Sequence, residues 1–349
     1  MSRPLRSMMP LPSARAWRAL ALATLVASPL LAQGTDAPQR RTVNVRRDPL
    51  AAAIPSWSEQ IRIRESWLDK RHQMLVDMMR RHDVQMWIVV NEEFHNDPLA
   101  EFIAPPRPYT GNRDFFIFVD TGGPSLRRIA VTGYSEDNLK RWFESPDEPR
   151  PISVVLPELV KQYQPKHIAL GTGGKRGVTR SLTHDTWVDL TTLIGPDAAQ
   201  RVVPAANLIE EYLDTRIPEE KEYYTRAVQL TESLARRALS NEVIVPGKTT
   251  VGEVRNWLYD ALWAAGVRTW FQPDLRVQRQ GMGKASSRGF LAVAPESTVI
   301  RRGDVVHLDF GVSVMGFDTD WQKMAYVLKA GERDVPAGLK VAMQNSHTL

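Results

Sequence analysis

Apolar residues recur at helical intervals between residues 58 and 82, and charged residues fill the positions between them. Short, nearly continuous apolar runs follow, and such runs are typical of strands that are buried on both faces. We expect strands at 86–91, 115–120, 127–133, 167–171 and 201–205, and helices at 152–163 and 182–194. Alternating strands and helices favour an α/β domain at about 58–212.

A different order of elements is predicted after residue 212. A long helix at about 218–242 opens with Pro218 and three nearby glutamates and stops at Pro246-Gly247, and a second helix spans 251–265. We then expect strands within 270–279, 290–294, 305–312 and 317–327, and a last helix from about Pro336. The last helix has no stop signal, so we expect an α+β domain at 213–349 that is incomplete.

The first 32 residues predict an export signal. Four arginines and no acidic residue precede or flank an apolar run from Ala19 to Ala32. The run is shorter than the roughly 20 apolar residues that a spanning helix needs. We therefore expect cleavage after Ala32, no stable membrane insertion afterwards, a periplasmic or secreted location, and a linker at 33–57. An uncleaved anchor and a disordered start are the alternatives.

Composition limits the chemistry. The chain has 349 residues and no cysteine, which excludes disulfides, thiolate metal sites and a cysteine nucleophile. An exported protein without cysteine fits a bacterial periplasm. The net charge is +5, but residues 1–32 carry four of these charges, which leaves +1 for the rest. No basic stripe with interleaved aromatic residues occurs elsewhere, so we do not expect nucleic acid as a partner.

One predicted hairpin, at 303–322, gathers acidic side chains. If its turn centres between Val314 and Met315, three pairs lie directly opposite each other: Asp309 with Asp320, His307 with Gln322, and Gly311 with Asp318. These six residues share one polar face of the hairpin. The other face is apolar and includes Leu308, Phe310, Phe317 and Trp321.

The opposed aspartates point to a cation. Directly opposite residues have Cβ atoms about 5 Å apart, and two carboxylates at that distance repel each other unless a proton or a cation bridges them. Two divalent metals about 3.5–4 Å apart suit this spacing, and carboxylate oxygens favour Mn²⁺, Co²⁺, Zn²⁺ or Mg²⁺ over copper. The alternative is a solvated strand face that is acidic without binding metal.

Residues 303–322, GDVVHLDFGVSVMGFDTDWQ, resemble the Asp-x-Gly…Asp segment of the pita-bread metallohydrolases, which include aminopeptidase P, prolidase, methionine aminopeptidase and creatinase. As in that family, the two aspartates are eleven residues apart. Residues 216–222 resemble the entry to the first helix of the catalytic domain, and residues 244–250 resemble the family's Pro-Gly-x-Thr turn. The resemblance covers roughly 58–349. It implies a creatinase-type N-terminal α/β domain followed by the first half of a pita-bread domain.

By this resemblance, Asp309 and Asp320 would hold two divalent metal ions, with Mn²⁺ as the first expectation and Co²⁺ or Zn²⁺ as alternatives. His307 and Asp318 would support these ligands or face the substrate. The family's remaining His and Glu ligands, and its general acid–base Glu, would lie beyond Leu349. We therefore expect the chain as given to be inactive. We also expect the apolar face of its hairpin to be poorly covered, so that proteolysis would leave a core ending near residue 213.

Three functions stay open. The first is an exported metallopeptidase resembling Xaa-Pro aminopeptidase or prolidase, the second a creatinase-like hydrolase of another small C–N substrate, and the third a non-catalytic binding protein. The two aspartates favour the first two. Ala292 stands near the place of a histidine that family peptidases carry, and this absence favours the last two over a conventional aminopeptidase P. Gln322-Lys323 replaces the usual Thr-Arg of the family, which bears on the substrate and the rate rather than on the fold. The expected partner is a peptide substrate, and a homodimer stays open.

Overall fold

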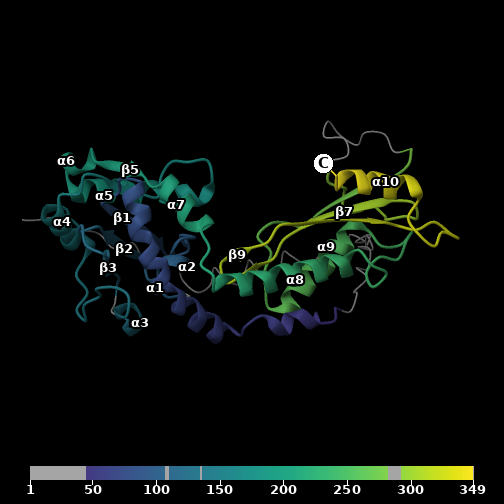
Figure 1. Ribbon diagram of the computed structural model, residues 1–349, viewed down its shortest axis with the longest axis horizontal. Helices are drawn as coiled ribbons and strands as arrows, with labels where there is room; N and C mark the ends of the chain where they lie inside the picture. The colour runs from purple at the N-terminus through teal and green to yellow at the C-terminus, as the bar shows by residue number, and fades with distance from the viewer. Residues whose placement is uncertain (1–44, 107–109, 134–135, 282–291, 349) are drawn as a thin grey trace, which may run out of the picture. The chain divides into compact units, whose positions relative to one another are not determined.

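Figure 1 presents a computed structural model that describes residues 45–348 except 107–109, 134–135 and 282–291. The predicted export signal at 1–32 and the first part of the predicted linker lie outside the described residues. No helix in the described part is both long enough and apolar enough to cross a bilayer.

The α/β region contains a five-stranded mixed sheet in the order β3-β2-β1-β4-β5. Its strands are β1 (Met86–Glu92), β2 (Arg113–Val119), β3 (Arg127–Val131), β4 (Ile168–Leu170) and β5 (Val202–Pro204). β1 pairs antiparallel with β2 and β2 with β3, whereas β4 runs parallel to both β1 and β5. All five predicted strands are confirmed, and β2 and β3 form the predicted hairpin.

Helices cover both faces of this sheet (Figure 1). They are α1 (Trp57–Arg81), α2 (Ala100–Ile103), α3 (Asp137–Lys140), α4 (Ile152–Tyr163), α5 (His184–Ile194), α6 (Pro196–Ala199) and α7 (Ala206–Asp214), with the 3-10 turn η2 (Gly177–Arg180). Trp87 and Val89 of β1 pack in one core with α1 and α7. Met86 and Ile88 pack in another with α4 and α5. This explains why β1 is apolar at successive positions.

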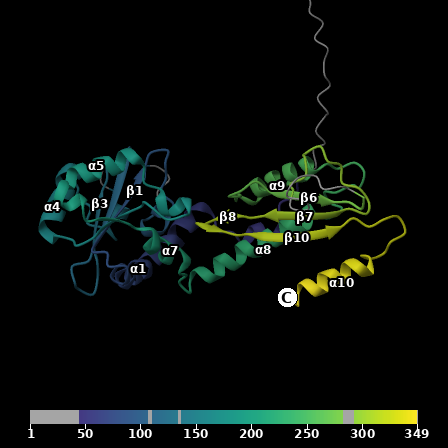
Figure 2. The same cartoon turned by 90° about the horizontal axis from the view of Figure 1, so that it is seen from above.

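The α+β region packs two helices against a three-stranded sheet in the order β10-β7-β6 (Figure 2). Its elements are α8 (Glu220–Ala238), α9 (Val251–Ala265), β6 (Asp274–Gln278), β7 (Val305–Phe310), β8 (Ser313–Val314), β9 (Phe317–Asp318), β10 (Trp321–Tyr326) and α10 (Ala337–Ser346). α9 begins with a capping box between Thr250 and Glu253 and ends at Gly266. Both helices and the main hairpin are confirmed, although α8 is shorter than predicted.

Two predictions about this region are wrong. Leu308, Phe310 and Phe317 are fully buried, so the apolar face of the hairpin is covered and does not lack contacts as expected. α8 and α9 supply much of this cover. The strand predicted at 290–294 is absent where it is described, because residues 292–294 form no strand, and its first two residues lie outside the described part.

The described end of the predicted linker packs against α8. The 3-10 helix η1 (Pro49–Ala53) follows Asp48, whose Oδ2 accepts hydrogen bonds from Ser233 Oγ at 2.8 Å and from Arg237 Nη1 at 3.0 Å. Asp48 is 2% exposed. Because the aspartate is buried and paired on two sides, it fixes this segment to the helix.

A buried ion pair links α1 to the start of α8. The Arg71 guanidinium donates from both Nε and Nη2 to Glu220 Oε1, and its Nη1 donates to the Tyr212 carbonyl at 3.1 Å. Arg71 and Glu220 have side chains 1% and 0% exposed. Glu220 lies in the stretch at 216–222 that resembles the entry to the first helix of a catalytic domain. Through this ion pair, Arg71 of the α/β region fixes the start of α8.

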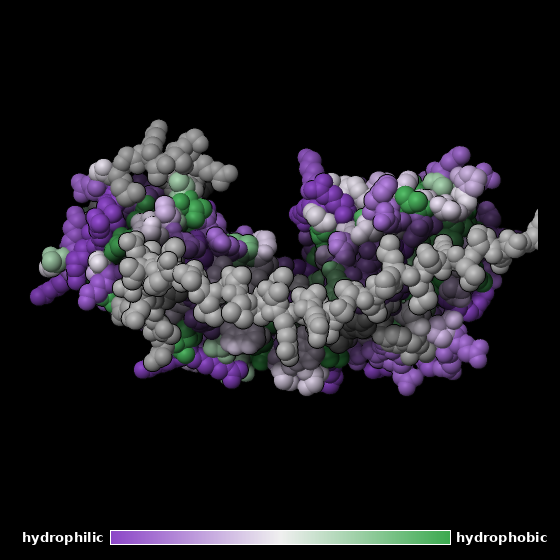
Figure 3. All heavy atoms as spheres, turned by 180° about the vertical axis from the view of Figure 1, so that it is seen from behind, coloured by the Kyte–Doolittle hydropathy of each residue, from purple (hydrophilic) through white to green (hydrophobic). Residues whose placement is uncertain are grey.

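The face of the molecule in Figure 3 is mostly hydrophilic and its hydrophobic residues are scattered, but helix α10 exposes several apolar side chains. No residue of α10 is buried, and Leu339, Val341 and Met343 are among the exposed large apolar residues. α10 therefore adds no side chain to the core of the described part.

Candidate metal site on the β7–β10 hairpin

The hairpin has a different register from the predicted one. Met315 and Gly316 both have positive φ, 55° and 79°, and form the centre of a two-residue turn between β8 and β9. Positive φ at both positions is the mark of a type I′ turn. The predicted turn centre, between Val314 and Met315, is therefore wrong by one residue, and every cross-strand pair shifts by two.

The corrected pairs change the neighbours of each candidate residue. Asp309 lies opposite Gln322, His307 opposite Met324, and Ser313 opposite Asp318. A shift of two residues leaves each side chain on its predicted face. Accordingly Leu308 and Phe310 are buried, whereas His307 and Asp309 are partly exposed on the opposite face.

Asp320 still acts on Asp309, although the two are not directly opposed. Burial raises the pKa of the Asp309 carboxyl, and the nearby charge of Asp320 raises this pKa further. Arg276 and His307 oppose the rise. Within the described part, Asp309 Oδ1 is buried and has no hydrogen-bond partner. The partly buried carboxyl group of Asp309 therefore feels the charge of Asp320, whose own side chain is exposed.

The regular strand pairing is interrupted at Gly311, opposite Asp320. The Val312 amide donates to Thr319 Oγ1 at 2.8 Å, so that the Thr319 carbonyl is free to accept from Trp270 Nε1, also at 2.8 Å. A Cβ on Gly311 would lie 2.0 Å from the Thr319 oxygen. Only glycine fits here without displacing backbone, and the residue after Thr319 is Asp320.

The other two predicted site residues differ in their placement. His307 Nε2 lies 3.1 Å from Gln322 Oε1, and Gln322 Nε2 donates to Asp309 Oδ2, also at 3.1 Å. The Gln322 amide thus connects the imidazole to the carboxylate. Asp318 and Asp320 are both exposed, and Asp318 lies two residues nearer the turn.

Two residues of this face were not predicted from the sequence. Asp274 on β6 lies directly opposite Asp309, and Arg276 lies opposite His307. Arg276 Nη2 donates to Asp274 Oδ2 at 2.7 Å and is 3.9 Å from Asp309 Oδ2. The alternation Asp-Leu-Arg-Val at 274–277 shows that the two share a face, but not that β6 pairs with β7.

The carboxylate oxygens on this face could supply some of the ligands of a divalent-metal site. Asp309 and Asp320 offer carboxylate oxygens, which Mn²⁺, Co²⁺ and Zn²⁺ accept as ligands, and Asp309 Oδ1 has no competing donor in the described part. Among the described residues, no group of three or more His, Cys, Asp or Glu side chains is arranged to hold a metal ion. The pair therefore fits the metals as two ligands of a larger set.

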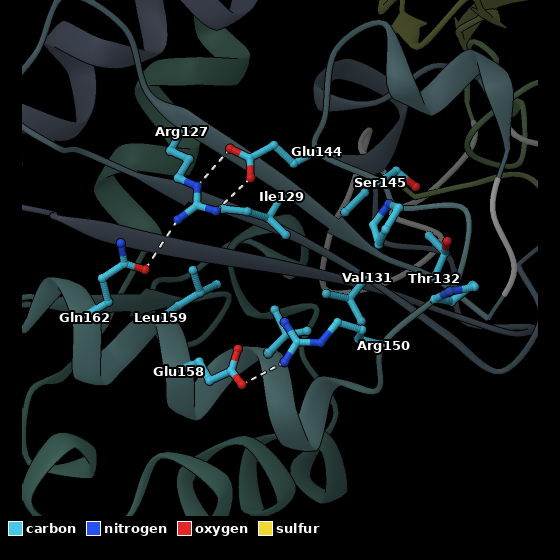
Figure 4. Close-up of a pocket in the computed structure, with 14 residues that line it drawn as sticks. Arg127, Ile129, Val131, Thr132, Glu144, Ser145, Arg150, Glu158, Leu159 and Gln162 are labelled. Carbon is cyan, nitrogen blue, oxygen red and sulfur yellow. Dashed lines mark hydrogen bonds and ion pairs between the residues drawn. The ribbon is translucent and has the colours of Figure 1, made fainter.

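A cavity of about 460 Å³ lies elsewhere, between β3, α4 and the loop at 144–150 (Figure 4). Its charged side chains already pair with one another. Arg127 donates twice to Glu144, and Arg150 donates once to Glu158. The cavity contains none of the predicted site residues and is separate from the candidate metal site on the hairpin.

Solved structures share this fold. An X-Pro aminopeptidase from Thermotoga maritima MSB8 has a TM-score of 0.54 and 15% identity, and the match covers 77% of this chain and 68% of that one. A Xaa-Pro dipeptidase from Bacillus anthracis has a TM-score of 0.52 and 20% identity, and the match covers 81% of this chain and 67% of that one. Aminopeptidase P from E. coli with the inhibitor Pro-Leu has a TM-score of 0.53 and 13% identity, and the match covers 76% of this chain and 62% of that one.

The match is one of structure. No protein-family model matches the chain, and no curated protein sequence does. The chain spans about two thirds of the length of the solved structures just named. The predicted architecture, an α/β region followed by part of a pita-bread domain, is therefore confirmed, and the chain has the fold of the Xaa-Pro aminopeptidases and prolidases.

Proposed function

We propose that the full-length protein is a metal-dependent peptidase of the Xaa-Pro aminopeptidase or prolidase type. One observation carries the proposal: the charge of Asp320 acts on the partly buried carboxyl group of Asp309 on the polar face of the hairpin, in a chain with the fold of Xaa-Pro peptidases. One structure of this fold is described as zinc-substituted aminopeptidase P. Two carboxylates in contact repel unless a cation or a proton lies between them.

The residues of the chain would prepare the site as follows. Gln322 holds Asp309 Oδ2, which leaves Oδ1 for a metal, and the buried apolar side of β7 keeps the strand rigid beneath it. Divalent ions held by Asp309 and Asp320 would polarise the peptide carbonyl and lower the pKa of the attacking water. His307 fixes the Gln322 amide from the other side, so its side chain would support Asp309 indirectly.

A second candidate function follows from Arg276. Its guanidinium pairs with Asp274 and lies near Asp309, so a positive charge already balances part of the acidic face. This arrangement favours a protein of the same fold that works without metal. It would be either a creatinase-like hydrolase of another small C–N substrate or a binding protein.

Substitution of single aspartates separates these functions. In the full-length protein, Asp309→Asn and Asp320→Asn should each lower bound Mn²⁺, Co²⁺ or Zn²⁺ and reduce hydrolysis of Xaa-Pro peptides by at least about a hundredfold, because each removes a ligand. Elemental analysis of the purified protein and a peptide panel measure both effects. Asp318→Asn is the matched control, since it makes the same change at an exposed position of the same hairpin.

The outcomes decide between the candidates. Loss of metal and of activity with the first two variants, with both nearly intact in Asp318→Asn, supports the peptidase. Unchanged metal content in all three variants would reject the metal site and favour the second candidate. If Asp318→Asn alone removes the metal, Asp309 and Asp320 are not the ligands.

We also propose that the protein is exported to the periplasm or secreted, with residues 1–32 as its signal. Support comes from the arginines and the apolar run at the N-terminus.

A further inference from the structure

The polar face of the three-stranded sheet carries two carboxylates in direct opposition. Asp274 on β6 faces Asp309 on β7 across the ladder. Like charges directly opposite each other destabilise a sheet. The side chains of Asp274 and Asp309 are only 20% and 18% exposed, so solvent screens their repulsion incompletely. Without a bound metal ion, a positively charged side chain is therefore needed to offset the repulsion between Asp274 and Asp309.

Arg276 supplies that charge. It lies on β6 two residues after Asp274, on the same face, and its side chain is 19% exposed. A single nitrogen, Nη2, reaches both acids, at 2.7 Å from Asp274 Oδ2 and 3.9 Å from Asp309 Oδ2. One guanidinium thus stands between the two carboxylates.

The pairing leaves hydrogen-bonding capacity unused. An arginine–carboxylate pair is strongest when two parallel N–H groups meet two oxygens. Here the buried Arg276 Nε has no partner in the described part, and neither does the buried Asp274 Oδ1. By contrast, Arg279 holds Asp304 through two nitrogens at 2.7 and 2.8 Å. Arg276 therefore donates one hydrogen bond, to Asp274, and none to Asp309.

We propose that Arg276 is the counter-ion of the metal-free site: it neutralises Asp274 and Asp309 until a divalent cation arrives, and it competes with that cation for Asp309. Asp274 is then a positioning residue, which keeps the guanidinium on the β6 side. This inference rests on the proposed function, because it requires Asp309 to bind metal. It predicts that charge-neutralising changes at two paired residues have opposite effects.

Calorimetric titration of the metal-free, full-length protein with Mn²⁺ alone tests this. Arg276→Gln should bind Mn²⁺ about tenfold more tightly than the wild type, because a repelling charge next to the cation is gone. Asp274→Asn should bind it about tenfold more weakly, since it removes a negative charge and releases the guanidinium towards Asp309. Arg276→Lys keeps the charge and should stay within about twofold of the wild type.

Arg302→Gln is the matched control. Arg302 is exposed and its guanidinium donates to the Leu328 carbonyl, so the variant makes the same change in net charge away from these carboxylates. Its Mn²⁺ affinity should equal that of the wild type. Should Arg276→Gln fail to fold, Arg276→Met, which preserves more of the apolar stem, repeats the measurement.

Each result has one meaning. Weaker or unchanged Mn²⁺ binding by Arg276→Gln, in a protein whose wild type binds Mn²⁺ and whose Asp309→Asn variant does not, overturns the counter-ion role alone. Equal weakening by Arg276→Gln and Asp274→Asn would mark an ordinary structural ion pair. Absence of Mn²⁺ binding by the wild type would reject the proposed function, and the counter-ion role with it.

Discussion

Gly311 is the residue on which the geometry of the hairpin depends most. A Cβ there would meet the Thr319 carbonyl oxygen at 2.0 Å and Trp270 Nε1 at 2.7 Å, and these two atoms are hydrogen-bonded to each other. The carbonyl belongs to backbone and cannot move without moving Asp320. A side chain at position 311 therefore disturbs packing and the acidic pair together.

Gly311→Ala should lower the free energy of unfolding by about 2 kcal/mol or more, as overpacking of a closed site does. Urea denaturation measures it. Gly338→Ala is the control, because a Cβ there meets nothing within 4 Å, and alanine in the helix α10 should be neutral or stabilise by up to about 1 kcal/mol. Unfolding of both variants at the urea concentration of the wild type would contradict the close approach of position 311 to the Thr319 carbonyl.

The sequence alone predicted the acidic face but not its register. Moving the turn centre by one residue shifts every cross-strand pair by two residues and leaves each side chain on the same face. The alternation of polar and apolar residues around Asp309 therefore fits both turn centres equally well. The choice depends on positive φ at Met315 and Gly316. Methionine seldom adopts this conformation, and Met-Gly is not one of the dipeptides typical of a type I′ turn.

At the scale of elements, local signals predicted the helices and most strands well. α9 has a capping box at its start and a glycine at its end, and α1 has a helical apolar stripe. Contacts between distant segments were not predictable in this way. The pairing of β6 with β7 joins segments that are far apart in the sequence, and it alone places Asp274 and Arg276 beside Asp309.

One inward-facing residue of α1 makes the α/β region sensitive to acid. His72 Nε2 lies 2.6 Å from the Ile103 carbonyl oxygen, and Nδ1 lies 2.7 Å from Arg128 Nη1. The carbonyl needs a proton on Nε2, and the guanidinium needs Nδ1 to be an acceptor, so the ring is neutral. Burial, opposed by the bond to Ile103 and aided by the charge of Arg128, lowers the pKa of His72 to about 3.

Between about pH 6.5 and 3 the unfolded chain therefore binds a proton at His72 that the folded chain does not bind. The contribution of neutral His72 is complete above pH 6.5 and is lost as the pH falls, by up to about 1.4 kcal/mol for each pH unit. His72→Gln should reduce the slope of the free energy of unfolding between about pH 5 and pH 7, measured by urea denaturation. Parallel slopes for the two proteins would contradict the assignment.

At the scale of the whole molecule, the order of the regions was predictable and their connection was not. Glu220 is a first-turn acid of a predicted helix, and sequence reasoning explains it by the helix dipole alone. In the structure it is fully buried against Arg71, which lies 149 residues earlier. Breaking one side of such a pair leaves a buried charge uncompensated, so both regions depend on this contact.

The precursor and the exported protein are expected to differ at the N-terminus. If residues 1–32 direct export and are removed, the mature protein begins at Gln33 and loses four positive charges. N-terminal sequencing of the protein from a periplasmic or secreted fraction should therefore start at or near Gln33. Replacing Leu25 and Leu31 in the apolar run by arginine should retain the precursor inside the cell, because a charged segment no longer enters the export machinery as an apolar helix. Substitution of Thr35 and Thr42 by alanine, beyond the cleavage site, should change neither location nor processing. Recovery of the wild-type protein in a soluble cytosolic pool with Met1 intact would show that these residues are not an export signal.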